Sequence, residues 1–242
     1  MIGARTRALL IILALLIGAA IAVAVLGREH RGLRPRPPAE RPKLLLLTSL
    51  PLMFGEQFSL QGGGSPALAA LETRYRVVPI SVTGPADLAE GRLLLMAHPA
   101  AQSAEDLVAL DDWVSRGGHL LLLADPMLEW PSSRPLGDPL RPPLMFMDTG
   151  LLSHWGLRLD APDERGQALR KLGGYDVEVV SPGRLVGGCE IASDAMVAGC
   201  RIGKGRAIVV ADADFLDTAR LGKPAQHNLD GLLGELAGLE GT

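Results

Sequence analysis

The chain has 242 residues, of which 48% are hydrophobic, 21% are charged and only 4% are aromatic. This length suits one large or two small domains, and the apolar content excludes a chain that is disordered throughout. Two cysteines exclude a disulfide-dense scaffold and a four-cysteine zinc site.

The charges are distributed unevenly along the chain. Residues 1–43 carry 8 Lys or Arg and 2 Asp or Glu, whereas residues 44–242 carry 16 and 25. Neutralising nucleic-acid phosphates requires a basic surface, and the larger part of this chain is acidic. We therefore expect no nucleic-acid partner.

The amino-terminal part divides into a tail (residues 1–7), an apolar segment (residues 8–26) and a basic, Pro-rich linker (residues 27–43). The apolar segment has 19 residues without a charge. As a helix it would extend roughly 28 Å, close to the ~30 Å hydrocarbon thickness of a bilayer. A cleaved signal peptide is the alternative, with Ala22-Val23-Ala24 as its cleavage site. The length of the run favours an uncleaved transmembrane helix and a single-pass membrane protein.

The charges that flank this helix bear on its orientation in the membrane. Its amino flank carries Arg5 and Arg7, whereas its carboxyl flank carries six Lys or Arg residues between positions 28 and 43. Positive charges accumulate on the cytoplasmic side of membrane helices. Charge alone thus favours a cytoplasmic carboxyl side, and the family resemblance described below implies the opposite.

The soluble part, residues 44–242, alternates short apolar runs with amphipathic stretches. Residues 43–50 (KLLLLTSL) form a continuous apolar run that is typical of a strand buried on both faces of a parallel sheet. Further strands are expected at residues 76–82, 92–97, 119–124 and 206–211, and helices at residues 65–75, 103–116, 151–155 and 226–239. This alternation predicts βαβ units and an α/β fold with a mostly parallel sheet and flanking helices.

The helix over residues 103–116 has the clearest start and stop signals. Ser103 and Asp106 resemble a capping box, and Gly117-Gly118 supplies a left-handed stop. After the following strand, residues 125–143 contain six prolines and are expected to form a long irregular surface loop. Residues 157–200 carry β-like pieces, among them residues 176–180 and 185–191.

Three stretches together resemble a known family. They are LLLMAHPAAQSAEDLVALDDWVSRGGHLLLLADP (residues 93–126), LLSHWGLRL (residues 151–159) and GKGRAIVVADADFL (residues 203–216). They are similar to the GldG-type auxiliary domain of uncharacterised ABC transport systems, which overlaps the DUF4350-like group. The resemblance covers roughly residues 44–240. It implies a flavodoxin-like α/β sandwich, similar to class I glutamine amidotransferases.

The resemblance also implies a location and partners. Such domains are tethered to the membrane, usually outside the cytoplasm, beside an ABC permease and an ATPase subunit. We therefore expect a single-pass inner-membrane protein whose soluble domain is periplasmic. This chain departs from the family pattern because it is short and lacks a second, carboxyl-terminal membrane span.

The catalytic residues of an amidotransferase are absent from the matching position. Such an enzyme needs a nucleophilic Cys on a sharp strand-to-helix turn. Here the turn after residues 119–124 reads Asp125-Pro126, and the cysteines lie much further along, at Cys189 and Cys200. We therefore expect a pseudoenzyme without catalysis or cofactor, acting as an auxiliary or scaffold subunit.

Four polar residues are expected at the carboxyl ends of parallel strands: His98, Asp125, Asp212 and Asp214. Open α/β sheets build their ligand clefts at that edge. Asp212-Ala213-Asp214 also matches the D-x-D of haloacid-dehalogenase phosphatases, but only 28 residues follow Asp214, too few for the remainder of that site. Either the acids simply end a strand, or the four line a residual groove of a ligand-sensing domain, which is the alternative function.

Cys189 and Cys200 lie 11 residues apart on two β-like pieces joined by a turn. Antiparallel pairing would bring them within the ~4.4–6.8 Å between Cα atoms that a disulfide requires. The alternative is two buried free thiols. The bridge would persist outside the cytoplasm and would be reduced inside it.

Two motif-like patterns are expected to carry no chemistry. The five histidines show no zinc-ligand spacing, so we expect no metal site. The stretch GCRIGK (residues 199–204) superficially resembles a P-loop, but its spacing is one residue short, and a glycine-rich hairpin turn explains it better.

The loop over residues 126–143 is the expected partner-contact surface, together with the apolar side chains of Trp130, Leu140, Leu144 and Phe146. The alternative is a solvent-facing loop whose apolar residues are incidental.

Overall fold

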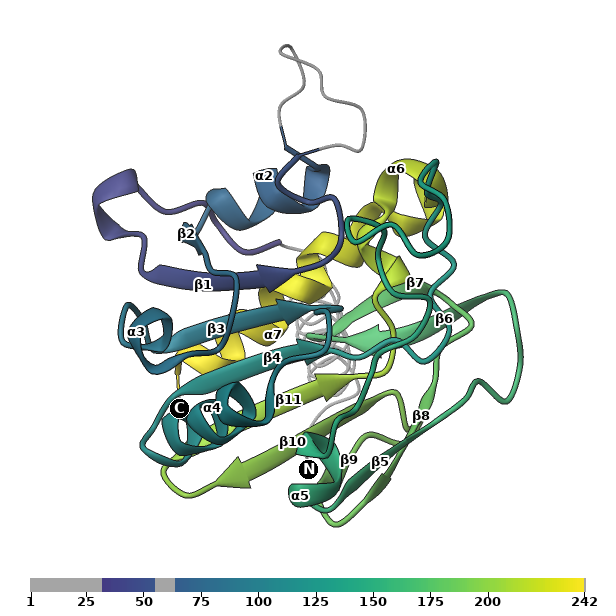
Figure 1. Cartoon of the computed structure of the whole chain (residues 1–242). Coiled ribbons are helices and arrows are strands. Elements are labelled where there is room, and N and C mark those ends of the chain that lie inside the picture. The colour runs from purple at the N-terminus through teal and green to yellow at the C-terminus, as the bar shows by residue number, and fades with distance from the viewer. Residues whose placement is uncertain (1–31, 55–63, 242) are drawn as a thin grey trace, which may run out of the picture. The chain divides into compact units, whose positions relative to one another are not determined.

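The computed structural model describes residues 32–54 and 64–241 (Figure 1). The described residues from Arg34 onward form one compact unit. The expected membrane segment at residues 8–26 lies outside the described residues. Among those that are described, no helix is long and apolar enough to cross a membrane.

A seven-stranded sheet forms the centre of this unit, in the order β2-β1-β3-β4-β11-β10-β9. The first five strands in that order run parallel, and β10 and β9 are antiparallel additions. The strands are β1 (Lys43–Thr48), β2 (Arg76–Pro79), β3 (Leu93–Ala97), β4 (His119–Leu123), β9 (Glu190–Ile191), β10 (Val197–Ile202) and β11 (Gly205–Val210). The predicted α/β fold with a mostly parallel sheet is confirmed.

The apolar runs of the sequence become the buried centre of this sheet. Leu44 and Leu45 of β1 and residues 120–123 of β4 have no exposed surface at all. Strands covered on both faces have no polar side to present, so they lack alternation and read as continuous leucine runs. This is why the central strands could be located from sequence.

Helices cover both faces of the sheet (Figure 1). One face carries α3 (Pro85–Leu88) and α4 (Ala104–Ser115), which contact each other, while α2 (Pro66–Glu72) contacts α7 (Asn228–Glu240) on the other face. Shorter helices connect the remaining elements: α5 (Leu151–His154), α6 (Thr218–Leu221), and the 3-10 turns η1 (Pro38–Glu40), η2 (Asp214–Leu216) and η3 (Lys223–His227).

Helix α4 begins and ends where its capping signals predicted. The Ser103 hydroxyl accepts a hydrogen bond from the Asp106 backbone N–H at 3.1 Å, which satisfies a donor that the first helical turn leaves open. Gly117 follows with a φ of +109°, a conformation that glycine adopts without strain. The N-cap of α2 is likewise Ser65, which accepts from the Leu68 N–H.

Two small antiparallel sheets stand beside the main one. They pair β5 (Leu157–Asp160) with β8 (Arg184–Gly187) and β6 (Gln167–Leu172) with β7 (Tyr175–Val180). The strand expected over residues 185–191 is interrupted, because Gly187-Gly188 separates β8 from β9. Neither β6 nor α3 was predicted individually. The six-residue β6 is mostly polar, and α3 has only four residues.

The unit starts earlier in the chain than residue 44. The Arg36 N–H donates to the Thr73 carbonyl at 2.9 Å, and the Arg36 guanidinium lies 2.8 Å from a carboxylate oxygen of Glu240. Residues 34–43, which the composition assigns to a linker, therefore pack against α2 and α7 at the amino-end edge of the sheet.

The two borders of the main sheet are short. On one side β2 ends at Pro79, which has no N–H to donate. On the other side β9 pairs only with Ala198 and Gly199 of β10. Among the described residues, no strand pairs with the outer side of residues 200–202.

Candidate functional site at the carboxyl ends of the parallel strands

The four polar residues singled out in the sequence lie at one edge of the sheet. His98 follows β3, Asp125 follows β4, and Asp212 and Asp214 follow β11. All four have no exposed surface. The structure therefore brings them to the expected edge, as buried side chains and not as the walls of an open groove.

Asp125 and Asp212 bind backbone N–H groups with both of their oxygens. Asp125 accepts from the Met127 N–H at 2.8 Å and from the Ala213 N–H at 2.9 Å. These contacts fix the start of the long loop to the segment after β11.

Asp212 likewise joins two separate segments of the chain through backbone hydrogen bonds. It accepts from the Val180 N–H at 3.1 Å and from the Phe215 N–H at 3.0 Å, which joins the end of β7 to η2. Its carboxylate is thus occupied by donors within the fold.

Asp214 ties the loop to the helix that follows it. One oxygen accepts from the Glu129 N–H at 2.7 Å, and the other lies 3.0 Å from the Arg220 guanidinium. The Glu129 carboxylate in turn accepts from the Ser181 hydroxyl at 2.6 Å. The cluster therefore includes Glu129, Ser181 and Arg220, which the sequence did not indicate. Glu129 and Ser181 lie outside the helices and strands, and Arg220 lies in the four-residue helix α6.

Burial raises the pKa of each carboxyl group in this cluster. The pKa of Asp125 rises to about 6, with the backbone donors of Ala213 and Met127 acting in the opposite direction. The pKa of Asp214 rises to about 7, again through burial first. The pKa of Asp212 lies well above its ordinary value because of burial and of the neighbouring charges on Asp125 and Asp214. Three buried carboxyl groups at this spacing do not all ionise easily near neutral pH.

His98 holds the far end of the long loop. Its Nε2 lies 2.8 Å from the Pro143 carbonyl oxygen, and its φ is +46°. Burial lowers its pKa, which favours the neutral ring. Because a carbonyl oxygen can only accept, Nε2–H is the donor in this hydrogen bond. Its Nδ1 has no hydrogen-bond partner among the described residues. A non-glycine residue at positive φ is uncommon and is held there by its surroundings.

The loop predicted over residues 125–143 is irregular, as expected, and lies over these side chains. Besides the contacts already described, the Leu128 N–H donates to the Leu144 carbonyl at 2.9 Å and the Phe146 N–H to the Asp125 carbonyl at 2.6 Å. His98, Asp125 and Asp214 are therefore attachment points of the loop.

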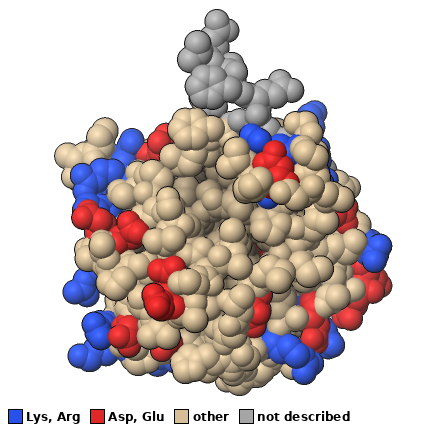
Figure 2. Space-filling model, in the orientation of Figure 1, with Lys and Arg blue, Asp and Glu red and all other residues tan. Residues whose placement is uncertain are grey.

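This loop and the four residues that follow it, 144–147, carry exposed apolar side chains. Five large ones are more than half exposed: Leu136 (73%), Leu140 (68%), Leu144 (52%), Met145 (53%) and Met147 (51%). Trp130 and Phe146 are only partly exposed. Figure 2 shows a face whose centre is occupied mostly by uncharged residues, with charged side chains gathered toward its margin.

Cys189 and Cys200 form a disulfide with their Cα atoms 4.9 Å apart. The disulfide joins β10 to the connection between β8 and β9 and lines a groove of about 950 Å³ near the amino ends of β4 and β11. Within the part of the chain that the structure describes, no group of three or more His, Cys, Asp and Glu side chains could hold a metal ion.

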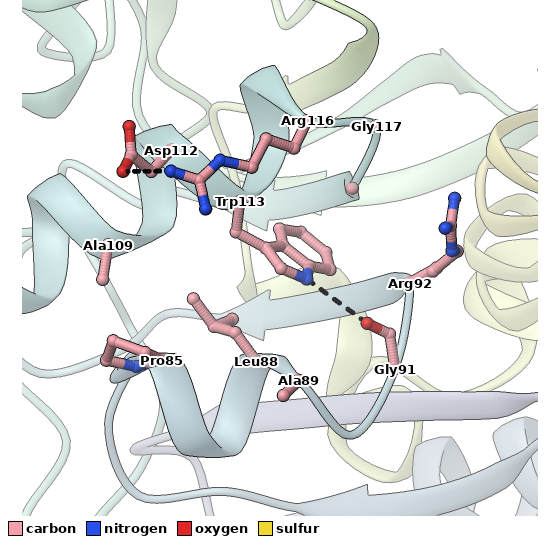
Figure 3. A pocket seen from close by; sticks show the side chains of 11 residues that line it. Pro85, Leu88, Ala89, Gly91, Arg92, Ala109, Asp112, Trp113, Arg116 and Gly117 are labelled. Atoms are coloured by element: carbon pink, nitrogen blue, oxygen red, sulfur yellow. Dashed lines mark hydrogen bonds and ion pairs between the residues drawn. The ribbon is translucent and has the colours of Figure 1, made fainter.

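A second pocket, of about 370 Å³, lies between α3 and α4 (Figure 3). Leu88 and Ala89 give it an apolar wall, and the Trp113 indole donates to the Gly91 carbonyl at 3.3 Å across it. Arg92 stands at its margin. None of the residues predicted to form a site lines this pocket.

Fold and sequence together define the class of protein. The chain is an α/β protein with a mostly parallel sheet and a Pro-rich loop over the carboxyl ends of its strands. Residues 41–163, from β1 through β5, match the family described as "ABC-type uncharacterized transport system", and the chain belongs to this family. The expected auxiliary domain of an ABC transport system is confirmed at this level.

Solved structures resemble the chain more distantly. An exo-β-1,4-mannosidase from Opitutaceae bacterium strain TAV5 has a TM-score of 0.48 and 13% identity, covering 82% of this chain and 36% of that one. A cytoplasmic protein from Salmonella typhimurium has a TM-score of 0.48 and 10% identity, covering 81% and 98%. The chain thus spans about a third of the mannosidase, and neither likeness bears on activity. No curated protein sequence matches the chain.

Proposed function

We propose that this chain is a membrane-anchored, non-catalytic auxiliary or scaffold subunit of an ABC-type transport system. The observation that carries this proposal is the family match over residues 41–163, which includes the whole Pro-rich loop with its exposed apolar side chains. In this reading the domain acts through its surface, and its direct partners are the permease and ATPase subunits.

The strand order supports the finer assignment of the fold. Taking β11 as the fifth parallel strand, the order β2-β1-β3-β4-β11 corresponds to the 2-1-3-4-5 order of flavodoxin-like sheets. We therefore propose that the domain is of the GldG type, in the DUF4350-like group, with a fold that resembles class I glutamine amidotransferases.

The chemistry available at the strand ends supports a non-catalytic role. The residue after β4 is Ala124, followed by Asp125 and Pro126, so the position of an amidotransferase nucleophile offers no thiol or hydroxyl. The chain's only cysteines are joined in the disulfide, and a thiolate is what such a nucleophile requires.

The proposed location is the inner membrane, with one span at residues 8–26 and the domain on the periplasmic side. The disulfide between Cys189 and Cys200 supports that side, because disulfides persist in the periplasm and are reduced in the cytosol. Labelling of substituted cysteines with an impermeant reagent in intact cells tests the orientation.

The proposed contact with the permease is the outer side of the Pro-rich loop. Apolar side chains exposed close together in the chain, as between Leu136 and Met147, are typical of a protein-binding surface. Leu140 and Leu144 are its best test positions, because both are exposed and replacing them leaves the buried core untouched.

The test is purification of the tagged full-length chain in mild detergent, followed by identification of what co-purifies. We expect a permease and an ATPase in near-equal amounts. The double variant Leu140→Ser and Leu144→Ser should lose them, whereas Leu169→Ser, which is 61% exposed on β6, should retain them. Recovery of the chain without a stoichiometric partner would contradict the scaffold role.

Ligand sensing beneath the loop is a second candidate function, favoured by one observation. Three buried carboxyl groups with raised pKa values lie at the same edge of the sheet as His98, and this is the edge where α/β proteins bind ligands. A ligand would have to displace the loop. A thermal-shift screen of the full chain tests this, because a ligand bound only by the folded state raises the melting temperature. The increase should disappear in Asp125→Asn.

A further inference from the structure

A row of basic side chains crosses three adjacent strands at the amino-end edge of the sheet. Arg201 of β10 lies directly opposite Arg206 of β11, and Arg206 is in register with His119 of β4. Residues in register on neighbouring strands point to the same face, about 5 Å apart. Two arginines and a histidine therefore stand side by side on one face, and all three line the groove of about 950 Å³.

The two arginines have no ion-pair partner in the part of the chain that the structure describes. Like charges directly opposite each other destabilise a sheet. Among the described residues, Arg201, Arg206 and the adjacent Lys204 form no ion pair. This arrangement contrasts with the carboxyl-end edge, where Arg220 is paired with both Asp214 and Asp217.

The carboxylates of the groove do not neutralise this row. Asp111 is occupied, since it accepts from the Trp155 indole N–H at 2.7 Å and lies 3.4 Å from His154. Glu190 lies opposite Gly199, one strand further out, and forms no ion pair among the described residues. Positive charge therefore remains in excess along the row.

The pKa of His119 and the space around Arg206 both agree with an excess of positive charge along this row. The pKa of His119 is lowered by burial first and then by the charges of Arg92 and Arg206, as expected in a region of positive potential. A Cβ at Gly199 would lie 3.3 Å from the Arg206 guanidinium, so the absence of a side chain at Gly199 leaves room for this guanidinium.

We propose that this groove binds a phosphate-bearing anion across Arg201, Arg206 and His119, with Lys204 closing one end. Arginine guanidinium groups present fixed pairs of donors to phosphate oxygens, and a tetrahedral phosphate accepts from several directions at once. A planar carboxylate offers two oxygens and fits a row of three donors less well. The site lies at the opposite edge from the carboxyl cluster and does not depend on the transport role.

The bound phosphate group could belong to either of two kinds of molecule, a soluble phosphate ester or a lipid headgroup. The residues that begin the compact unit lie at the same edge, because the Arg36 N–H donates to the Thr73 carbonyl just before β2. Measuring the binding of a lipid headgroup and of a soluble phosphate compound to the same protein distinguishes the two sources.

The experiment is isothermal titration calorimetry of the full chain in a neutral detergent. The probes are inorganic pyrophosphate, short-chain phosphatidylglycerol, short-chain phosphatidylcholine and acetate. Binding of pyrophosphate identifies a soluble ester as the source, and binding of phosphatidylglycerol alone identifies a lipid headgroup. Binding of neither, or of acetate as tightly as either, would overturn the proposal.

Matched variants locate the site. Arg206→Gln and Lys204→Gln should each weaken binding by about tenfold or more, the usual effect of losing a charge-assisted hydrogen bond. Arg165→Gln removes an exposed charge outside the groove and should change affinity by less than about twofold. Glu190→Gln should tighten binding. Thermal unfolding without ligand confirms that each variant is folded, and unchanged affinity in folded Arg206→Gln and Lys204→Gln would overturn the proposal.

Discussion

The charged residues at the two ends of the parallel strands differ in burial and in how their charges are paired. At the carboxyl ends, Asp125, Asp212 and Asp214 are buried and every one of them binds backbone N–H groups of the long loop or its neighbours. At the amino ends, Arg201 and Arg206 face each other without an ion pair among the described residues. Polar residues at the edge where ligands usually bind can thus be fully occupied by hydrogen bonds within the fold. The side chains that remain able to bind a ligand are then those at the opposite edge.

Removing a carboxylate from the buried end should produce the largest effect. Asp212→Ala leaves the N–H groups of Val180 and Phe215 buried without an acceptor, which should lower the free energy of unfolding by roughly 2–5 kcal/mol. Asp212→Asn keeps an acceptor oxygen and should cost clearly less. Urea unfolding of the full chain in detergent measures both, and equal losses would contradict the structural role.

Removing the disulfide should have the next largest effect on stability. It acts near the amino ends of the parallel strands. The bridge closes a loop between residues 11 apart, for which chain-entropy arguments give about 3 kcal/mol. The double variant Cys189→Ser and Cys200→Ser should therefore have a lower melting temperature. A reductant should lower the melting temperature of the unmodified chain toward that of the variant and leave the variant unchanged.

The buried carboxyl groups should also make stability depend on pH. The pKa of Asp125 is raised to about 6 and that of Asp214 to about 7, so the folded state keeps protons that the unfolded state releases above pH ~4. Their contribution to stability is fully present below that pH and is lost as pH rises to about 7, by up to roughly 3 kcal/mol for Asp125.

The slope of this loss can be assigned by substitution. Asp125→Asn removes one titrating group and the repulsion that it exerts on Asp212 and Asp214. The free energy of unfolding of this variant should fall less between pH 4 and pH 7 than that of the unmodified chain, as measured by urea titrations at each pH. Parallel curves would show that Asp125 does not titrate in this range.

The smallest effect is expected at the unpaired arginines, and it has the opposite sign. Arg201→Gln removes a like charge facing Arg206 and should stabilise the ligand-free chain by less than about 1 kcal/mol. Arg165→Gln controls for the change in net charge. A loss of stability in Arg201→Gln would mean that repulsion between the two guanidinium groups does not destabilise the fold.

The parts that sequence predicts well are those with local causes. Ser103 and Gly117 fix the ends of α4 by their own hydrogen bonding and backbone preference, and the leucine runs identify the central strands. The carboxyl-end residues were likewise assigned to one edge, since parallel strands end together.

The parts that could not be predicted depend on contacts between distant segments. Burial of Asp214 depends on the backbone of Glu129, 85 residues earlier, and nothing in the sequence announces that contact. The row formed by Arg201, Arg206 and His119 exists only through strand register, since His119 is 87 positions from Arg206. Cross-strand neighbours of this kind become visible only once the pairing is known.

The borders of the main sheet bear on self-association. An open strand edge is a template on which further chains can add, the first step toward fibrils. Here Pro79 ends the strand at one border. At the other border, among the described residues, the outer side of the two-residue β9 and residues 200–202 of β10 have no paired strand, and this stretch of β10 includes charged Arg201 and Cys200, which the disulfide fixes. Both borders are thus poor templates, so the domain should stay free of edge-to-edge aggregation even at high local concentration.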